Sequence, residues 1–202
     1  MTQAATLPPR TVSRLERRKA RTRTAIIDAA ADLFSVAGFE ATSMLQIAER
    51  ADTGVGTLYG YFRSKEDVLR EVLREHSAIA VERYRAAVDD ETPPLDRLCM
   101  AIETFAGYLR DHRTLLRAAL NTPAGAESGA QPGDWVVTVF AQMIGGGMEA
   151  GDLRPVPAET VARALVSTCV DAMLGIGVWR GHEDAPATIP ALLAMARACL
   201  RP

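Results

Sequence analysis

The chain has 202 residues, of which 48% are hydrophobic and 24% are charged. These proportions are typical of a globular protein with a substantial core, and no repeat or low-complexity block interrupts them. The formal net charge of −2 argues against electrostatic binding of a polyanion by the molecule as a whole.

The charge is nevertheless unevenly distributed. Residues 1–30 carry seven basic and two acidic side chains, a net charge of +5, so the remaining residues carry −7. A basic end on an acidic body predicts a polyanionic partner at that end only. We interpret residues 1–20 as a flexible basic arm.

The first predicted helix ends at the sequence Ala-Gly-Phe-Glu, where Gly38 supplies a C-terminal glycine. Apolar residues recur before it at spacings of three or four: Ala25, Ala29, Leu33, Phe34 and Ala37. A second, short helix is predicted from Ser43, which forms an S-x-x-Q capping box with Gln46.

A third helix is predicted over residues 55–62, separated from the second by a turn at 52–54. Leu58 and Phe62 are four residues apart and are expected to point into the core. The opposite side then exposes a different set of residues. Glycine weakens a helix by about 1 kcal/mol, so we interpret the glycines of this segment as positions where the backbone approaches a partner closely. The exposed set is Thr57, Tyr59, Gly60 and Tyr61, and together with Val55 and Gly56 these residues are the contacts expected with that partner.

Ser64 and Asp67 begin a long predicted helix that stops at residues 89–94. Beyond it the pattern is helical throughout, apart from a Gly/Pro-rich loop at 121–134. The expected fold is all-α, with domains at 21–66 and 67–202. Further helices are expected over 95–109, 113–120, 135–150, 157–180 and 188–200.

The predicted helix over 157–180 is apolar on two sides, so both sides must be buried. We interpret it, with the last helix, as a homodimer interface, the alternative being that both helices fill the core of one chain. The residues expected in the interface are Val166, Val170, Leu174, Val178, Leu192, Leu193 and Ala196.

A short helix, a tight turn and a second short helix form a helix-turn-helix, a motif that binds DNA. The segment around it resembles the DNA-binding region of the TetR (tetracycline repressor) family of bacterial transcriptional regulators, over about residues 21–73. The resemblance rests on several positions in fixed register: Ile47-Ala48, Ala51, Gly56-Thr57-Leu58-Tyr59, Tyr61-Phe62, Ser64-Lys65 and Leu69.

The resemblance implies a homodimer with an N-terminal DNA-binding domain and a helical effector-binding domain. It implies that Thr57, Tyr59 and Tyr61 contact phosphates or base edges and that Lys65 holds a phosphate. Backbone N–H groups at Ser43 would contact another phosphate. The turn Asp52-Thr53-Gly54 departs from the Gly-Val-Ser that is common in the family, and its acidic side chain could repel a phosphate.

The basic arm is then expected to track phosphates or to enter the minor groove. The alternative is a solvated tail whose arginines mainly aid solubility. The candidate contact residues are Arg17, Arg18, Lys19, Arg21 and Arg23.

Regulators of this kind respond to an effector. The second domain contains aromatic and sulfur-bearing residues that could line an apolar cavity for a small-molecule effector. Each of them could equally be a core residue. The candidates are Phe105, Tyr108, Trp135, Phe140, Met143, Cys169 and Met173.

Other classes of function find less support. His76, His112 and His182 lack metal-ligand spacing, and no nucleophile motif surrounds the cysteines. The glycine-rich segment 145–151 lacks a phosphate-loop pattern. No catalytic residue, metal or cofactor is therefore expected. We see no secretory signal and no uninterrupted membrane span, and interpret Cys99, Cys169 and Cys199 as reduced, buried thiols. The expectation is a cytoplasmic, ligand-responsive repressor that binds an inverted-repeat operator. The alternative is a ligand-independent DNA-bound scaffold.

Overall fold

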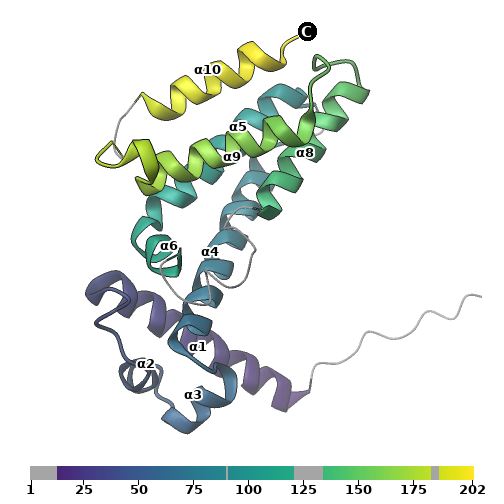
Figure 1. Ribbon diagram of the computed structural model, residues 1–202. Helices are drawn as coiled ribbons and strands as arrows, with labels where there is room; N and C mark the ends of the chain where they lie inside the picture. Colours follow the sequence, from purple (N-terminus) through teal and green to yellow (C-terminus); the bar gives the residue numbers. More distant parts are fainter. Residues whose placement is uncertain (1–12, 90, 121–133, 183–186) are drawn as a thin grey trace, which may run out of the picture. The chain divides into compact units, whose positions relative to one another are not determined.

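The computed structural model describes residues 13–89, 91–120, 134–182 and 187–202, and every regular element within these ranges is a helix (Figure 1). The expected all-α class is therefore confirmed. The chain divides into two compact units, Met1–Val68 and Leu69–Pro202. Helix α4 (Lys65–Ala87) begins in the first unit and continues into the second.

The first unit contains α1 (Arg14–Ala37), α2 (Met44–Arg50) and α3 (Val55–Tyr61). Its core consists of apolar side chains from all three helices and from the start of α4, which have at most 6% of their surface exposed. Burial of each large side chain contributes about 1.5–3 kcal/mol. The core residues are Ile26, Ile27, Ala29, Ala30, Phe34, Phe39, Ile47, Ala48, Leu58, Phe62 and Val68.

Helix α1 begins earlier than the sequence analysis expected. Ser13 and Glu16 form a complete capping box, in which Ser13 N donates to Glu16 Oε2 at 2.7 Å and Glu16 N donates to Ser13 Oγ at 3.1 Å. These two bonds satisfy N–H groups that a helix start otherwise leaves unpaired. The expected flexible arm is thus wrong for residues 14–20, which are helical; residues 1–12 lie outside the described part of the chain.

The second unit contains α5 (Pro94–Asp111), α6 (Arg113–Leu120), α8 (Asp134–Glu149), α9 (Ala158–Leu174), the short 3-10 helix η1 (Gly177–Trp179) and α10 (Thr188–Leu200). Helix α9 packs on α8 and α5 and also contacts α6 and α10 (Figure 1). It therefore forms the centre of the second core. Most of the expected loop at 121–134 lies outside the described residues.

The predicted helix over 157–180 is too long. Helix α9 stops at Leu174 because Gly175 adopts a left-handed conformation (φ +63°), which a glycine C-cap accommodates without steric cost. The side chain of Arg113 donates from Nε to the backbone oxygen of Met173 at 2.8 Å, satisfying one of the carbonyls left open at the helix end.

Burial in the chain's own core corrects the expected dimer interface at four positions, while a role for Val170, Leu193 and Val178 stays a prediction. Val166, Leu174, Leu192 and Ala196 are buried in the chain's own core, with 0–4% exposure, so they have no surface to offer a partner. Val170 and Leu193 are half-buried against that core. Val178 lies in η1 and is 91% exposed.

A close approach explains one residue of the glycine-rich segment at the end of α8. A Cβ atom on Gly147 would lie 2.6 Å from Leu153 Cδ1 and 3.1 Å from Pro94 Cβ, whereas one on Gly145 or Gly146 would meet nothing within 4 Å. Close packing therefore accounts for the glycine at position 147 but not for those at 145 and 146.

The stretch Ala158–Trp179 is long and apolar enough to satisfy a composition test for a membrane span. Its main part, however, is α9, whose buried residues face the second core. A central core helix passes the same test, so this match is weak support for a membrane location.

Candidate nucleic-acid interface and ligand pocket

The turn between α2 and α3 has the geometry of a helix-turn-helix. Asp52 adopts a positive φ of +48°, which aspartate tolerates better than most residues, and Thr53 N donates to Ala48 O at 3.0 Å to close the turn. Gly54 follows as the N-cap of α3. The chain can therefore reverse within three residues and begin α3 at Val55.

Helix α3 is anchored on one side and open on the other. Leu58 is fully buried and Phe62 is 6% exposed, as expected, while Tyr59 is 52% exposed. Gly56 and Gly60 face open space, because a Cβ atom at either position would meet nothing within 4 Å. The packing of this chain therefore gives no reason for glycine at these two positions.

The N-terminus of α2 is capped as expected. Ser43 N donates to Gln46 Oε1 at 2.8 Å, and Gln46 N donates to Ser43 Oγ at 3.2 Å. The far end of α2 is joined to α1 by an exposed ion pair, Arg50 Nη2 to Asp32 Oδ2 at 2.7 Å. An exposed pair stabilises by at most about 1 kcal/mol, so the buried side chains supply most of the anchoring. A phosphate contact at Ser43 stays a prediction.

Lys65 has an internal role that its sequence position did not reveal. Its Nζ donates to the backbone oxygens of Phe39 at 2.7 Å and of Glu40 at 3.4 Å, and lies 4.3 Å from the centroid of the Phe39 ring. The half-buried lysine thus holds the loop between α1 and α2. Its expected phosphate contact would have to use the remaining N–H donor.

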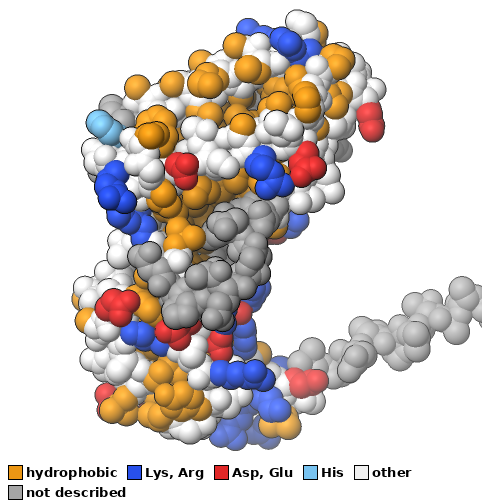
Figure 2. Space-filling model, viewed as in Figure 1, with side chains coloured by type: hydrophobic (Ala, Val, Ile, Leu, Met, Phe, Trp, Pro, Cys, Tyr) orange, Lys and Arg blue, Asp and Glu red, His pale blue; other side chains and the backbone are white. Residues whose placement is uncertain are grey.

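An open groove of about 1140 Å³ separates the first turns of α1 from α3 and the preceding turn. Figure 2 shows Lys and Arg side chains gathered over the start of α1 and near α3. The groove therefore combines positive charge with the exposed side of the helix-turn-helix. Its lining residues are Arg14, Leu15, Arg18, Lys19, Arg21, Thr22, Ala25, Ala51, Asp52, Thr53, Thr57 and Tyr61.

This groove brings together Arg21, Thr57 and Tyr61 from the expected DNA-contact set. Tyr59, Gly56 and Gly60 are exposed on α3 beside it, and Val55 is half-buried. Arg14 also lines the groove and was not among the predicted contacts, although the spacing of Ser13 and Glu16 indicates a helix start before it.

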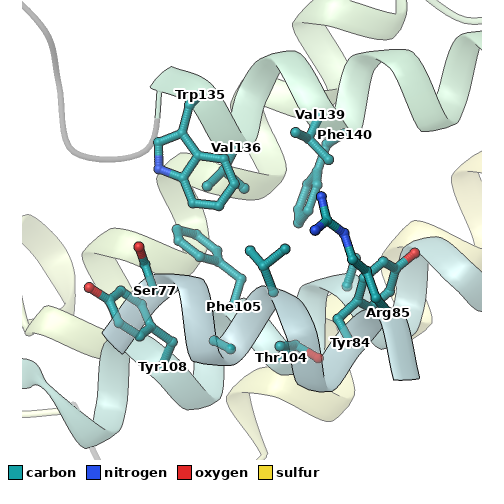
Figure 3. A pocket seen from close by; sticks show the side chains of 13 residues that line it. Ser77, Tyr84, Arg85, Thr104, Phe105, Tyr108, Trp135, Val136, Val139 and Phe140 are labelled. Carbon is teal, nitrogen blue, oxygen red and sulfur yellow. The ribbon is translucent and has the colours of Figure 1, made fainter. Parts of the chain in front are cut away.

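The second unit holds an apolar pocket of about 350 Å³ between α4, α5 and α8 (Figure 3). Four of the expected effector residues line it: Phe105, Tyr108, Trp135 and Phe140. Cys169 and Met173 are buried in the core instead, and Met143 packs against the core without lining the pocket. The sequence analysis missed the contribution of α4, which comes from Ser77, Ala80, Val81, Tyr84 and Arg85.

Polar groups are few in this pocket, and burial dominates their behaviour. Tyr108 donates from its hydroxyl to Leu73 O at 3.0 Å, and burial raises the pKa of Tyr108 to about 12. Arg85 lies at one side of the pocket beside Val139 and Phe140 (Figure 3) and pairs with Glu82 at 2.7 Å. The lining of the pocket is thus mainly apolar, with Arg85 as its charged side chain.

Among the described residues, no cluster of three or more His, Cys, Asp or Glu side chains is arranged to hold a metal ion. The rings of His76 and His112 do contact each other, with centroids 4.5 Å apart and planes tilted by 52°.

Comparison with known proteins finds a family match over the helix-turn-helix. Residues 26–72 match the family described as bacterial regulatory proteins, tetR family. The "HTH-type transcriptional repressor KstR" of Mycolicibacterium smegmatis is 42% identical over 94 residues, which are 46% of this chain and 45% of the relative. The "A-factor receptor protein" of Streptomyces griseus is 33% identical over 141 residues, 68% of this chain and 48% of the relative. The matched part thus spans less than half the length of these curated relatives.

Solved structures extend the comparison to the whole fold. A transcriptional regulator of the TetR/AcrR family from Thermobifida fusca has a TM-score of 0.66 at 22% identity, with 86% of this chain and 95% of that chain covered. At this identity the likeness shows the fold alone. The KstR relative is by its name a transcriptional repressor, which agrees with the expectation that the chain is not an enzyme.

Proposed function

We propose that this chain, whose residues 26–72 match the family described as bacterial regulatory proteins, tetR family, belongs to that family and is a cytoplasmic, ligand-responsive transcriptional repressor. It binds an inverted-repeat operator as a homodimer and is released by a small apolar or amphipathic molecule. The observation that carries this proposal is the basic groove beside the exposed side of α3.

The DNA contact is made by α3, whose outward side enters the major groove. Thr57 and Tyr59 supply hydroxyl groups for phosphates or base edges. Gly56 and Gly60 face open space in the chain alone, so their lack of a side chain serves the approach of the duplex rather than internal packing. Leu58 and Phe62 hold the helix from below.

The homodimer is formed through surface that remains exposed after the core is complete. Helix α10 presents a row of small apolar residues and one large one, Met195, which is 63% exposed. Hydrophobic side chains are visible along α10 in Figure 2. The row recurs at helical spacing, as expected for a helix packed against another helix: Ala191, Ala194, Met195 and Ala198.

The effector occupies the pocket between α4, α5 and α8. A volume of about 350 Å³ lies within the usual range of about 300–1,000 Å³ for small-molecule sites. The lining is predominantly apolar and aromatic, so it selects an apolar body, and Arg85 at the side can pair with an anionic or acceptor group. Because α4 begins in the DNA-binding unit, a ligand that contacts α4 can influence that unit.

The experiment replaces Tyr59 by alanine and measures affinity for an operator selected with the wild-type protein. Tyr59→Ala removes an exposed side chain, so the fold and the dimer should persist while operator affinity falls by about 10-fold or more, the loss of one good contact. Unaltered affinity would reject the assignment of this side of α3. Val139→Trp, which fills the pocket from a partly exposed position, should preserve operator binding and abolish release by an effector.

The rival interpretation, a DNA-bound scaffold without a ligand, differs in one observable property. A scaffold binds many sites and has no released state, whereas the repressor dissociates when its effector is present. A compound that frees the wild-type protein from the operator but not the Val139→Trp variant favours the repressor.

A further inference from the structure

The first turns of α1 project beyond the core of their unit. All residues in Arg14–Arg21 are exposed, and the first buried residue of the helix is Ile26. At 1.5 Å per residue, this places Arg14 about 18 Å along the helix from Ile26. The capping box of Ser13 and Glu16 supports this segment, since it has no buried side chain to hold it.

Three of the five basic residues in Arg14–Arg21 lie on one side of the helix, and Lys19 lines the groove from a neighbouring side. Arg14, Arg18 and Arg21 are spaced i, i+4 and i+7 and therefore share one face. All three line the groove that also contains Thr57 and Tyr61 of α3. Arg17, one of the residues expected to contact DNA, is exposed but does not line the groove, so it is not part of the contact proposed here.

We propose that Arg14, Arg18 and Arg21 form a helical clamp on the phosphodiester backbone of the duplex that α3 reads. This inference rests on the proposed function, because it takes the duplex in the groove as given. It replaces the flexible arm of the sequence analysis with a rigid, side-specific contact. The clamp holds the helix-turn-helix on DNA of any sequence, since phosphates are the same at every base pair.

The clamp has a thermodynamic signature. Each phosphate neutralised by an arginine releases counterions, so the logarithm of the binding constant falls with the logarithm of salt concentration by about 0.9 per contact. Loss of a clamp residue should flatten this dependence and weaken specific and nonspecific binding by the same factor. Loss of a base contact would weaken specific binding selectively.

The test compares two adjacent arginines with the same change in charge. Arg18→Gln removes a residue that lines the groove, and Arg17→Gln removes one that does not. Binding to a fluorescent random-sequence duplex of about 30 base pairs is followed by anisotropy between about 50 and 200 mM salt. Circular dichroism verifies that both variants keep the wild-type helix content.

If the clamp exists, Arg18→Gln should reduce the slope of log binding constant against log salt concentration by about one per DNA-binding domain. Affinity at low salt should fall several-fold. Arg17→Gln should bind within twofold of the wild type, with an unchanged slope. Equal losses of duplex affinity in the two variants would show a general effect of net charge and would overturn the clamp. The clamp would also be overturned if Arg18→Gln lost no affinity. If the wild-type protein itself fails to bind duplex DNA, the proposed function fails, an outcome distinct from these.

Discussion

Lys65 donates a hydrogen bond from Nζ to the backbone oxygen of Phe39 at 2.7 Å, and the same ammonium group lies 4.3 Å from the centroid of the Phe39 ring. The lysine therefore fixes the loop that leads from α1 into α2. The family resemblance predicts that Lys65 contacts a phosphate, but in the structure this residue stabilises the loop between α1 and α2.

Replacing Lys65 by methionine separates these roles. We expect Lys65→Met to lower the free energy of unfolding by about 1–2 kcal/mol, because it removes a charged donor and a cation–π contact at a half-buried position. Operator affinity should fall through the loosened loop while the salt slope stays unchanged. Urea unfolding and anisotropy at several salt concentrations measure both effects. A slope that falls by about one would instead demonstrate a direct phosphate contact.

The glycines of α3 should trade stability against binding. Gly56→Ala and Gly60→Ala should each raise the free energy of unfolding by up to about 1 kcal/mol, because alanine favours the helix and meets no neighbour. The added methyl group should nevertheless reduce operator affinity at the close approach.

Gly146→Ala provides the matched control, since Gly146 is also helical and faces open space but lies in the second unit. It should stabilise the protein and leave operator binding intact. If Gly56→Ala and Gly60→Ala bind the operator as tightly as Gly146→Ala, the close approach along α3 is disproved.

Asp52 places an acidic side chain in the lining of a basic groove. Asp52→Asn keeps a residue that tolerates the positive φ of +48° and removes the charge that opposes phosphates. We expect duplex affinity to rise several-fold at low salt and the gain to shrink at high salt. Titration of a random-sequence duplex measures this. If Asp52→Asn raises duplex affinity less than this, or by the same factor at all salt concentrations, phosphates do not lie near Asp52.

The three cysteines should differ in reactivity. Cys99 and Cys169 are buried, and burial raises the pKa of the Cys169 thiol to about 12, while Cys199 is exposed at the end of α10. The expectation of three buried thiols is therefore wrong for Cys199. At pH 8 the native protein should titrate one thiol per chain with a colorimetric disulfide reagent and three after denaturation. Rapid reaction of two or three native thiols would contradict the packing of the second core.

The same reagent probes the proposed dimer contact. Met195→Glu places a charge in the exposed row of α10 and should produce monomers in sedimentation experiments. If a second copy covers this face, Cys199 should react faster in the variant than in the wild type. A Met195→Glu protein that remains dimeric, with unchanged Cys199 kinetics, would move the dimer contact elsewhere.

Local signals predicted most of the first unit. Gly38 ends α1, and Ser43 with Gln46 caps α2, because these residues satisfy backbone groups within a few positions of themselves. The inward positions of Leu58 and Phe62 followed from helical spacing alone. The start of α1 was missed although Ser13 and Glu16 carry the same kind of capping signal, because the density of arginines suggested a solvated segment.

The second unit shows what a pattern of residues leaves open. A helix that is apolar on two sides must be covered twice, but spacing does not reveal whether its own chain or a partner supplies the cover. Helices α5, α8 and α10 cover α9, so Val166 and Leu174 became core residues rather than interface residues. The apolar pattern also continued past Gly175, whose left-handed conformation ends the helix. The internal role of Lys65 could not be predicted from local sequence either, because its partner Phe39 is distant in sequence.

The central claim is that the exposed side of α3 recognises a particular duplex sequence. The most direct measurement is selection of bound duplexes from fragments of the host genome, followed by competition of the enriched duplex against random-sequence DNA. Our account predicts enrichment of an inverted repeat whose half-sites lie about 34–36 Å or a larger multiple apart, together with preferential binding over the competitor. Equal binding of the enriched and random duplexes would contradict it.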